Sequence, residues 1–309
     1  MLPYIIRRLL WLPVVLLVVS LITFALGYYG PGDPIQVRLG PRSNPDAVAR
    51  MRHELGLDRP FLVQYADYVW KAAQGDLGES IKYQGEPVVS LIGRRIWVSA
   101  QLGLAAMVIG LVLGLPLGFF AALRQGSWVD RVIVSSSLLF AAVPTFVSGP
   151  LFLWLFASRL HLLPSAGWGG LFDSRVILPS LVLGLGLVAG FARQTRASII
   201  DVLSHEYVRT AWSKGLAPQN VFGRHVARNA LIPILTLFGL MLGGLVEGAF
   251  ITETVFGIPG IGRLGVDSLF ARDYPVIMAL TLIVAVSYIL ANLLVDLLYA
   301  VLDPRIRYG

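Results

Sequence analysis

Six long apolar stretches dominate this sequence. They cover residues 9–28, 99–122, 132–156, 176–192, 231–252 and 276–301, and the fourth is the shortest. A helix needs about 20 apolar residues to cross the roughly 30 Å hydrocarbon core of a bilayer. Charged residues make up only 14% of the chain, well below the share of about 25% in soluble domains. The pattern predicts an all-α polytopic membrane protein with six transmembrane helices.

Lysine and arginine are distributed unevenly between the connections. If both termini lie inside the cell, the inner segments hold twelve of these residues and the short outer loops hold four. Basic residues favour the cytoplasmic side of a membrane. The asymmetry predicts a multi-pass protein of the cell (inner or plasma) membrane, surrounded by lipid, with both termini in the cytoplasm.

The first outer connection, residues 29–98, is long enough to hold two helices of its own. Asn44 and Pro45 suit the start of one helix, which Gly56 ends. Pro60 and Gly75 bound the second in the same way. Such a pair either packs on the outer surface of the protein or receives a soluble partner, and the sequence leaves both possibilities open.

The charged inner connection, residues 201–233, predicts two short helices separated by a break. The predicted faces are Ile200, Leu203, Tyr207 and Ala211 in the first helix, and Val221, Phe222, His225, Val226 and Asn229 in the second. Gly215 suits a left-handed cap after Lys214, and Pro218 suits a first helical position. The segment is either a docking surface or an amphipathic connector lying on lipid headgroups.

The same connection contains a distinctive set of residues. They are Tyr207, Arg209, Thr210, Ala211, Lys214, Gly215, Leu216, Arg224, His225, Arg228 and Asn229. This set resembles the ATPase-coupling loop of ABC-importer permeases, specifically of the dipeptide/oligopeptide (peptide/nickel) branch. Arg209 and Thr210 replace the Glu-Ala of the general motif, and Pro233 lies 18 residues after Gly215, later than in that motif. The resemblance is therefore to the peptide-type branch.

The resemblance extends over nearly the whole chain. It includes residues 30–34, 52–58, 75–80 and 292–305. It implies a type I ABC-importer permease with a first helix in residues 1–28, a helical extracytoplasmic loop in 29–98, a permease core in 99–301 and a cytoplasmic tail in 302–309. Within the core, the implied coupling loop covers residues 193–230 and an outer gate loop covers residues 253–275.

Permeases of this family work in complexes, so the resemblance also implies partners. These are a second homologous permease subunit, two P-loop ATPase subunits and an extracytoplasmic solute-binding protein. Di- or oligopeptides are the leading cargo, and similar permeases also carry nickel complexes, glutathione or oligosaccharides. The chain would form half of the translocation path.

The connection before the last apolar stretch is rich in glycine and proline and is a candidate outer gate. The candidate residues are Phe256, Gly257, Pro259, Gly260 and Arg263. Non-helical backbone at membrane depth is tolerated only where protein surrounds it or where it lines a cavity. Similarity to the same loop of peptide-type permeases supports gating or contact with the binding protein.

Glu247 is an acidic residue inside the fifth apolar stretch. A carboxylate facing hydrocarbon is unfavourable by up to about 3 kcal/mol. Glu247 therefore either lines the translocation path or forms a structural contact between helices. A proton-coupled secondary transporter that uses Glu247 is the alternative from a different functional class, but we find no internal repeat of the kind it predicts.

Glycine spacing predicts close helix contacts. Gly110, Gly114 and Gly118 lie at four-residue steps, as do the pairs Gly239 with Gly243 and Gly244 with Gly248. Such strips let another helix approach closely, either within this subunit or from a second permease. Pro144 and Pro150 predict a bend in the third stretch.

Several kinds of chemistry are excluded by the residues present. No lysine follows a glycine, so there is no phosphate-binding loop, and ATP and Mg are expected on partner chains, with no cofactor bound here. The four histidines lack metal-ligand spacing, and no nucleophile and base pair is visible, so neither a metal site nor an enzyme is expected. The scattered basic residues form no stripe for nucleic acid.

Overall fold

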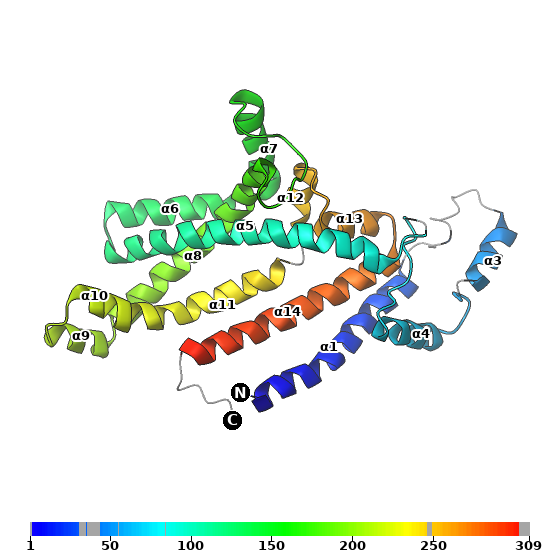
Figure 1. The fold of residues 1–309 in the computed structure, drawn as a ribbon, viewed down its shortest axis with the longest axis horizontal. Helices are drawn as coiled ribbons and strands as arrows, with labels where there is room; N and C mark the ends of the chain where they lie inside the picture. Colours follow the sequence, from blue (N-terminus) through cyan, green and yellow to red (C-terminus); the bar gives the residue numbers. More distant parts are fainter. Residues whose placement is uncertain are drawn as a thin grey trace.

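The computed structural model describes residues 2–30, 35, 44–54, 56–83, 85–245 and 249–302. Long helices run side by side along its longest axis (Figure 1). They are α1 (Leu2–Tyr29), α5 (Val88–Leu123), α6 (Trp128–Ala142), α8 (Ile177–Leu203), α11 (Arg228–Gly244) and α14 (Tyr274–Leu302). The described residues form no β-strand, only an isolated bridge between Glu79 and Pro87. The all-α prediction is confirmed.

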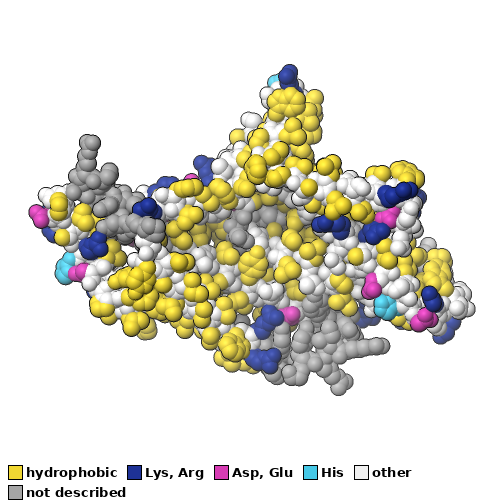
Figure 2. All heavy atoms as spheres, turned by 180° about the vertical axis from the view of Figure 1, so that it is seen from behind, with side chains coloured by type: hydrophobic (Ala, Val, Ile, Leu, Met, Phe, Trp, Pro, Cys, Tyr) yellow, Lys and Arg dark blue, Asp and Glu magenta, His cyan; other side chains and the backbone are white. Residues whose placement is uncertain are grey.

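Shorter helices connect the long ones. They are α3 (Pro45–Glu54), α4 (Phe61–Ala73), α7 (Thr145–Phe152), α9 (Glu206–Ser213), α10 (Pro218–Asn220), α12 (Phe250–Val255) and α13 (Ile261–Phe270). Figure 1 places α9 and α10 at the end of the bundle where α1 begins and α14 ends, and α3, α4 and α13 toward the opposite end. Hydrophobic side chains cover much of the face in Figure 2, and charged side chains lie toward its two ends, at its lower edge and at the tip of the upper projection.

Five helices of the described chain are long and apolar enough to cross a membrane. A sixth crossing is made if α6 counts as one span with the helical segment Thr145–Arg159, which consists of α7 and a π-helical turn (Leu153–Arg159). The axes of α6 and of this segment differ by 97°. The predicted bend in the stretch of residues 132–156 is confirmed, and it is sharp enough to divide the stretch into separate helices. The break falls at Pro144, because proline has no N–H to donate and shifts the preceding residue, here the extended Val143, out of the helical region.

Two predicted spans are shorter than the helices that contain them. α5 begins at Val88 and has 36 residues, which gives a length of about 54 Å at 1.5 Å per residue. Residues 88–98, which were predicted as the end of the helical outer connection, are therefore the first turns of this long helix. α8 likewise continues past residue 192 to Leu203. Apolar residues mark only the part of a helix that lies in hydrocarbon, and the backbone stays helical beyond it.

The fifth predicted span, residues 231–252, is displaced along the chain. A continuous helix runs from Pro218 to Gly244, through α10, a π-helical turn (Val221–Ala227) and α11. α12 then begins at Phe250 as a separate helix. Glu247 and Gly248 lie outside the described residues, as do residues 31–34, Leu55 and residues 303–309.

Glycine strips bring the long helices together. A Cβ added at Gly114 of α5 would lie 2.7 Å from the Cβ of Phe191 in α8 and 2.9 Å from the Val188 carbonyl oxygen. Gly110 and Gly118 approach α8 in the same way. On α11, an added Cβ at Gly243 would lie 2.7 Å from the ring of Tyr288 in α14. The predicted close packing is confirmed for the strip on α5 and for Gly239 with Gly243 on α11, and these contacts lie within this chain. The predicted pair of Gly244 with Gly248 includes a residue outside the described part of the chain.

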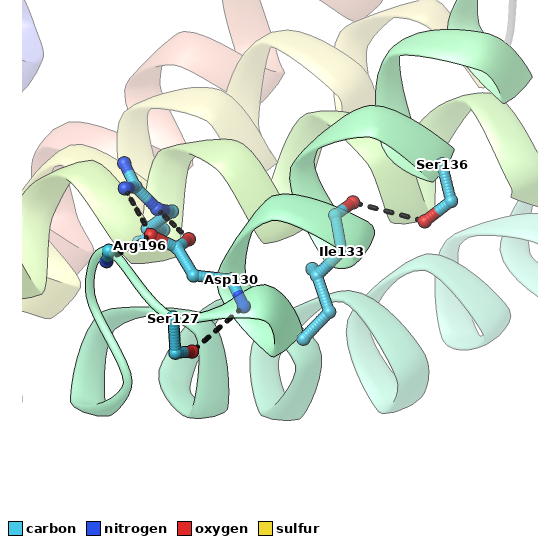
Figure 3. A network of polar contacts seen from close by, with 6 residues as sticks. Ser127, Asp130, Ile133, Ser136 and Arg196 are labelled. Carbon is cyan, nitrogen blue, oxygen red and sulfur yellow. Dashed lines mark hydrogen bonds and ion pairs between the residues drawn. The ribbon is translucent and has the colours of Figure 1, made fainter.

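An ion pair joins α6 to α8 at the end of the bundle that carries α9. Figure 3 shows Asp130 and Arg196 facing each other across the two helices. Arg196 Nε donates to Asp130 Oδ1 at 2.5 Å and Arg196 Nη2 donates to Oδ2 at 2.8 Å. The Asp130 side chain is 5% exposed and also accepts a hydrogen bond from the Gly126 N–H. This bidentate pair fixes the start of α6 against α8.

Replacing Arg196 with leucine is expected to destabilise the folded subunit by about 2 kcal/mol. The substitution leaves the Asp130 carboxylate buried and unpaired, and breaking a fully buried pair costs about 3–5 kcal/mol, which we reduce because Arg196 is 28% exposed. Thermal unfolding in mild detergent measures the effect. The matched control is Arg131→Leu, one residue beyond Asp130 and exposed. Equal melting temperatures for the two variants would contradict the assigned role.

Candidate functional site

The candidate site is the connector, defined as residues 204–227, which joins α8 to α11. It contains α9, α10 and a π-helical turn. In Figure 1 it projects beyond the ends of α8 and α11. Most of its side chains are exposed, but Val208, Ala211, Val221 and Val226 are buried. The connector is thus a surface structure with its own attachment to the bundle.

The connector begins with a break that the sequence pattern did not predict. α8 ends at Leu203, Ser204 caps it, and His205 has an extended backbone (ψ 143°) that starts α9. Ile200 and Leu203 therefore belong to α8, and Tyr207 and Ala211 belong to α9. The predicted single helical face across these four residues is wrong. The buried face of α9 is formed by Val208 and Ala211, and Tyr207 is exposed.

A hydrophobic cluster attaches the connector to the long helices. Val208 of α9 and Val221 of the π-helical turn are 1% and 0% exposed, and both pack in a cluster with Ala122 of α5 and Val202 of α8. Aromatic rings extend this contact, since the centroid of the Phe222 ring lies 6.1 Å from that of Trp212 and 6.0 Å from that of Phe119. α9 is therefore packed against three long helices and is not part of a slack loop.

Gly215 sets the turn between α9 and α10. Its φ of +72° lies in the left-handed region, and its N–H donates to the Trp212 carbonyl at 2.9 Å. An added Cβ would meet nothing within 4 Å, so the backbone conformation and not lack of space favours glycine. Lys214 caps α9 and Pro218 takes the first position of α10. These three local predictions are confirmed.

The eleven candidate coupling residues lie in the connector and in the first turn of α11. The structure brings Tyr207 and Asn229 together, because Asn229 Nδ2 donates to Tyr207 Oη at 3.0 Å and to the His225 carbonyl at 2.9 Å. Arg209 pairs with Glu206 at 3.0 Å. The exposed members are Tyr207, Arg209, Thr210, Lys214, Gly215, Leu216, Arg224, Arg228 and Asn229; Ala211 is buried and His225 is half-buried. Ala211 contributes to attachment and cannot contact a partner.

The candidate gate lies near the opposite end of the bundle and is built differently from the prediction. The glycine- and proline-rich connection was expected to be a loop, but α12 and α13 leave only a short turn between them, residues 256–260. Phe256 is 2% exposed and packs against Leu102 of α5 and Val182 of α8. Gly257 has a φ of +64°. The turn is anchored in the helix bundle rather than free at the surface.

A buried carboxylate holds this turn. Glu253 of α12 is 0% exposed, and its Oε1 accepts from Ser99 Oγ at 2.6 Å while its Oε2 accepts from the Arg263 N–H at 2.8 Å. Ser99 Oγ in turn accepts from the Ile261 N–H at 2.8 Å. The two side chains satisfy N–H groups at the start of α13 that have no helical partner. A Cβ at Gly260 would collide with both side chains, so only glycine fits there.

A second buried carboxylate connects the α13–α14 corner to the segment before α5. Asp273 is 0% exposed and accepts hydrogen bonds from Ser80 Oγ, from the Ile81 N–H at 3.0 Å and from the Lys82 N–H at 3.1 Å. These contacts join residues about 190 positions apart in the sequence. They fix the part of the chain that follows α4 to the start of α14.

Family comparison identifies this arrangement. Residues 114–308 match the family described as "Binding-protein-dependent transport system inner membrane component", and residues 1–91 match the one described as "Binding-prot-dependent transport system membrane comp, N-term". The chain belongs to this family of importer permeases. A stand-alone, proton-coupled transporter is therefore not the class of this protein.

The relatives of this permease are similar along its entire length. It is 38% identical to the probable peptide ABC transporter permease protein y4tP of Sinorhizobium fredii, over 99% of both chains. It is 41% identical to the glutathione transport system permease protein GsiC of Escherichia coli, over 100% of both chains. The identification as a peptide-type ABC-importer permease is confirmed by these two relatives.

Solved importers share the fold of the permease. An inward-facing MetNI methionine ABC transporter aligns with a TM-score of 0.59 at 17% identity, covering 71% of this chain and 100% of that chain. An amino acid ABC transporter crystallised with histidines aligns with a TM-score of 0.52 at 18% identity, covering 68% and 93%. At these identities the likeness concerns the fold alone, and it confirms the type I importer-like architecture.

Three features of the permease site were not predicted from the sequence. Trp212 is 42% exposed on α9, and an aromatic residue within a charged segment was the available signal. Ser99 gave no signal, because a serine in an apolar helix has no visible partner in the sequence. The role of Asp273 depends on Ser80, and no local spacing connects residues so far apart.

Proposed function

We propose that this permease imports di- or oligopeptides, and that its connector receives separate ATPase subunits. The observation that carries the proposal is an exposed, polar connector held to α5, α8 and α11 by a buried hydrophobic cluster. ATP and Mg would be bound by the partner chains, and their closure would displace α9. Because α9 is attached through Val208 and Ala211, that displacement reaches the long helices. The connector and both termini would face the cytoplasm.

The proposed cargo follows from the relatives. One is named as a probable peptide permease and the other as a glutathione permease, and glutathione is itself a small peptide. Nickel complexes and oligosaccharides have no such support. A cavity of about 500 Å³ between α5, α8, α11 and α14 has a mostly apolar lining, with Ser99 and Tyr288 as polar members. This cavity supports the proposal that these four helices line the translocation path.

The second half of the path would come from a homologous permease subunit. α7 and the π-helical turn after it project away from the long helices in Figure 1. Phe146, Leu151 and Trp154 on this projection are 59%, 51% and 51% exposed. A projecting helix with large apolar side chains is a suitable contact for a second permease. The solute-binding protein would dock near the opposite end from the connector, where the turn of residues 256–260 is the proposed gate.

Replacing Gly215 with valine is expected to lower uptake about tenfold while ATP hydrolysis continues. The left-handed backbone at this position costs about 1–2 kcal/mol for a residue with a side chain. This strain would distort the turn between α9 and α10, and ATP hydrolysis would then no longer be coupled to uptake. The measurement compares ATP hydrolysis with uptake of labelled peptides and glutathione by the reconstituted importer.

The cargo is tested with the native importer by adding nickel complexes and an oligosaccharide to the same panel of labelled compounds. Uptake of either one in place of peptides would refute the proposed cargo.

Gly223→Val is the matched control for Gly215→Val. Gly223 lies in the helical part of the connector, is exposed, and an added Cβ would meet nothing within 4 Å. Its substitution should leave coupled uptake close to that of the native importer. Coupled transport by Gly215→Val at the native rate, or an equal loss in both variants, would count against the connector as the coupling element.

A further inference from the structure

One helix of the first long connection lies deeper than an outer loop should. α4 packs against α1, a membrane span, and the contact reaches its middle. Tyr65 Oη donates to the Leu17 carbonyl at 2.9 Å and lies 3.0 Å from Ser20 Oγ. Leu17 is twelve residues before the end of α1 at Tyr29, a distance of about 18 Å along a helix. α4 therefore lies beside the distal half of a transmembrane helix and not beyond its end.

The face of α4 that meets α1 is aromatic. The Phe61 ring lies 5.5 Å from Phe24 and 5.2 Å from Tyr28, and the Tyr65 ring lies 5.5 Å from Phe24. Tyr68 lies 5.8 Å from the same ring, and its hydroxyl is buried without a hydrogen-bond partner among the described residues. Burial raises the pKa of Tyr68 to about 12. The cluster fixes α4 at this depth in apolar surroundings.

The remainder of α4 has two exposed flanks, one apolar and one that carries the charged residues together with Val63, which is 44% exposed. Leu62, Ala66 and Trp70 follow one another at four-residue steps and are exposed, with Leu62 at 72% and Trp70 at 69%. Asp67 and Lys71 lie on the neighbouring flank and are also exposed. A helix has 3.6 residues per turn, so the α1-facing, apolar and polar positions form three separate stripes.

α1 also exposes large apolar side chains along the part that contacts α4. At the same level α1 exposes Ile22 and Leu26, at 55% and 68%. Large apolar residues on a membrane span at this depth face hydrocarbon, and tryptophan is typical of the boundary with the headgroups. Asp67 pairs with Arg59 at 2.7 Å on the polar side, where both groups are exposed. A helix with this division lies in the plane where lipid meets water.

We propose that α4 is embedded in the membrane leaflet distal to the connector, with Leu62, Ala66 and Trp70 in contact with lipid and Asp67 and Lys71 toward water. The helix would add apolar, lipid-contacting surface beside α1. It would also hold the chain that leads to Ser80, and hence the Asp273 contact, at a fixed height above the bilayer. This proposal rests on the α1–α4 contact and is independent of the cargo and of the ATPase partners.

Single-cysteine spin labelling tests the proposal. The chain contains no cysteine, so Leu62→Cys, Ala66→Cys and Lys71→Cys can each be labelled alone in the full-length permease in lipid nanodiscs. Power saturation compares the accessibility of each label to oxygen, which concentrates in lipid, and to a polar nickel reagent. The ratio of oxygen accessibility to nickel-reagent accessibility at positions 62 and 66 should exceed the ratio at position 71 by about tenfold, because polar reagents partition poorly into hydrocarbon. Leu26→Cys and His53→Cys provide the lipid and water references.

Two outcomes would overturn the proposal. A ratio at position 62 equal to that at position 53 would place this flank in water, available to a soluble partner. Low accessibility to both reagents would mean that a protein surface covers it. All substituted positions are exposed, so the labels should not disturb the fold, and a single symmetric size-exclusion peak for each labelled variant verifies this.

Discussion

Replacing Gly114 with leucine is expected to prevent accumulation of the folded permease. The added Cβ would lie 2.7 Å from the Cβ of Phe191 and 2.9 Å from the Val188 carbonyl oxygen. Because one of these contacts is with the α8 backbone, a change of rotamer cannot relieve it. Overpacking of a core costs about 1–3 kcal/mol, and the loss should exceed this range because α5 and α8 form the main helix contact of the subunit.

Purification yield and thermal unfolding in detergent measure this effect. Gly93→Leu is the control, since Gly93 lies on the same helix and an added Cβ there would meet nothing within 4 Å. That variant should resemble the native chain in both yield and melting temperature. Similar behaviour of the two leucine variants would mean that the glycine strip is not what joins α5 to α8.

Glu253→Ala is expected to reduce stability by about 4 kcal/mol and to abolish uptake. The change leaves Ser99 Oγ and the N–H groups of Arg263 and Ala249 without their acceptor, and each buried unsatisfied group costs about 1–3 kcal/mol. It also removes the side chain against which Gly260 packs. The start of α13 and the turn before it would lose their fixed position.

Thermal unfolding and uptake by the reconstituted importer are the two readouts. Asp267→Ala removes a carboxylate from α13 that is 39% exposed and lies 3.9 Å from Arg263, so it should have little effect on either. Glu253→Gln keeps the shape but replaces one acceptor oxygen with a donor, and an intermediate loss is expected. A melting temperature for Glu253→Ala within error of that for Asp267→Ala would refute the role of this carboxylate.

Local chemistry predicted the parts of the permease that depend on neighbouring residues. Gly215 adopts the left-handed conformation expected at a helix end, Pro218 begins a helix, and a bend falls at Pro144. These features follow from the backbone limits of glycine and proline, which act within a few residues. The glycine strips also predicted close packing, although not which helix would fill them.

Helix boundaries were less predictable than helix existence. The extension of α5 to Val88 and of α8 to Leu203, and the displaced fifth span, share one cause. The length of an apolar stretch follows the thickness of the hydrocarbon core. A helix, by contrast, ends only where its backbone groups bond to other partners or where a helix-breaking residue occurs. The break at His205 had no such marker, because neither glycine nor proline occurs there.

The sequence by itself determined the helical class and the positions of the apolar stretches, because these depend on local composition and spacing, and its motifs carried the resemblance to importer permeases. Only the tertiary structure decided that Ser99 and Glu253 meet, that Asp273 holds the segment of Ser80, and that α4 lies beside the distal half of α1. These contacts join residues between about 45 and 190 positions apart. A buried polar group finds its partner only when folding brings distant helices together, so no local pattern encodes the pairing.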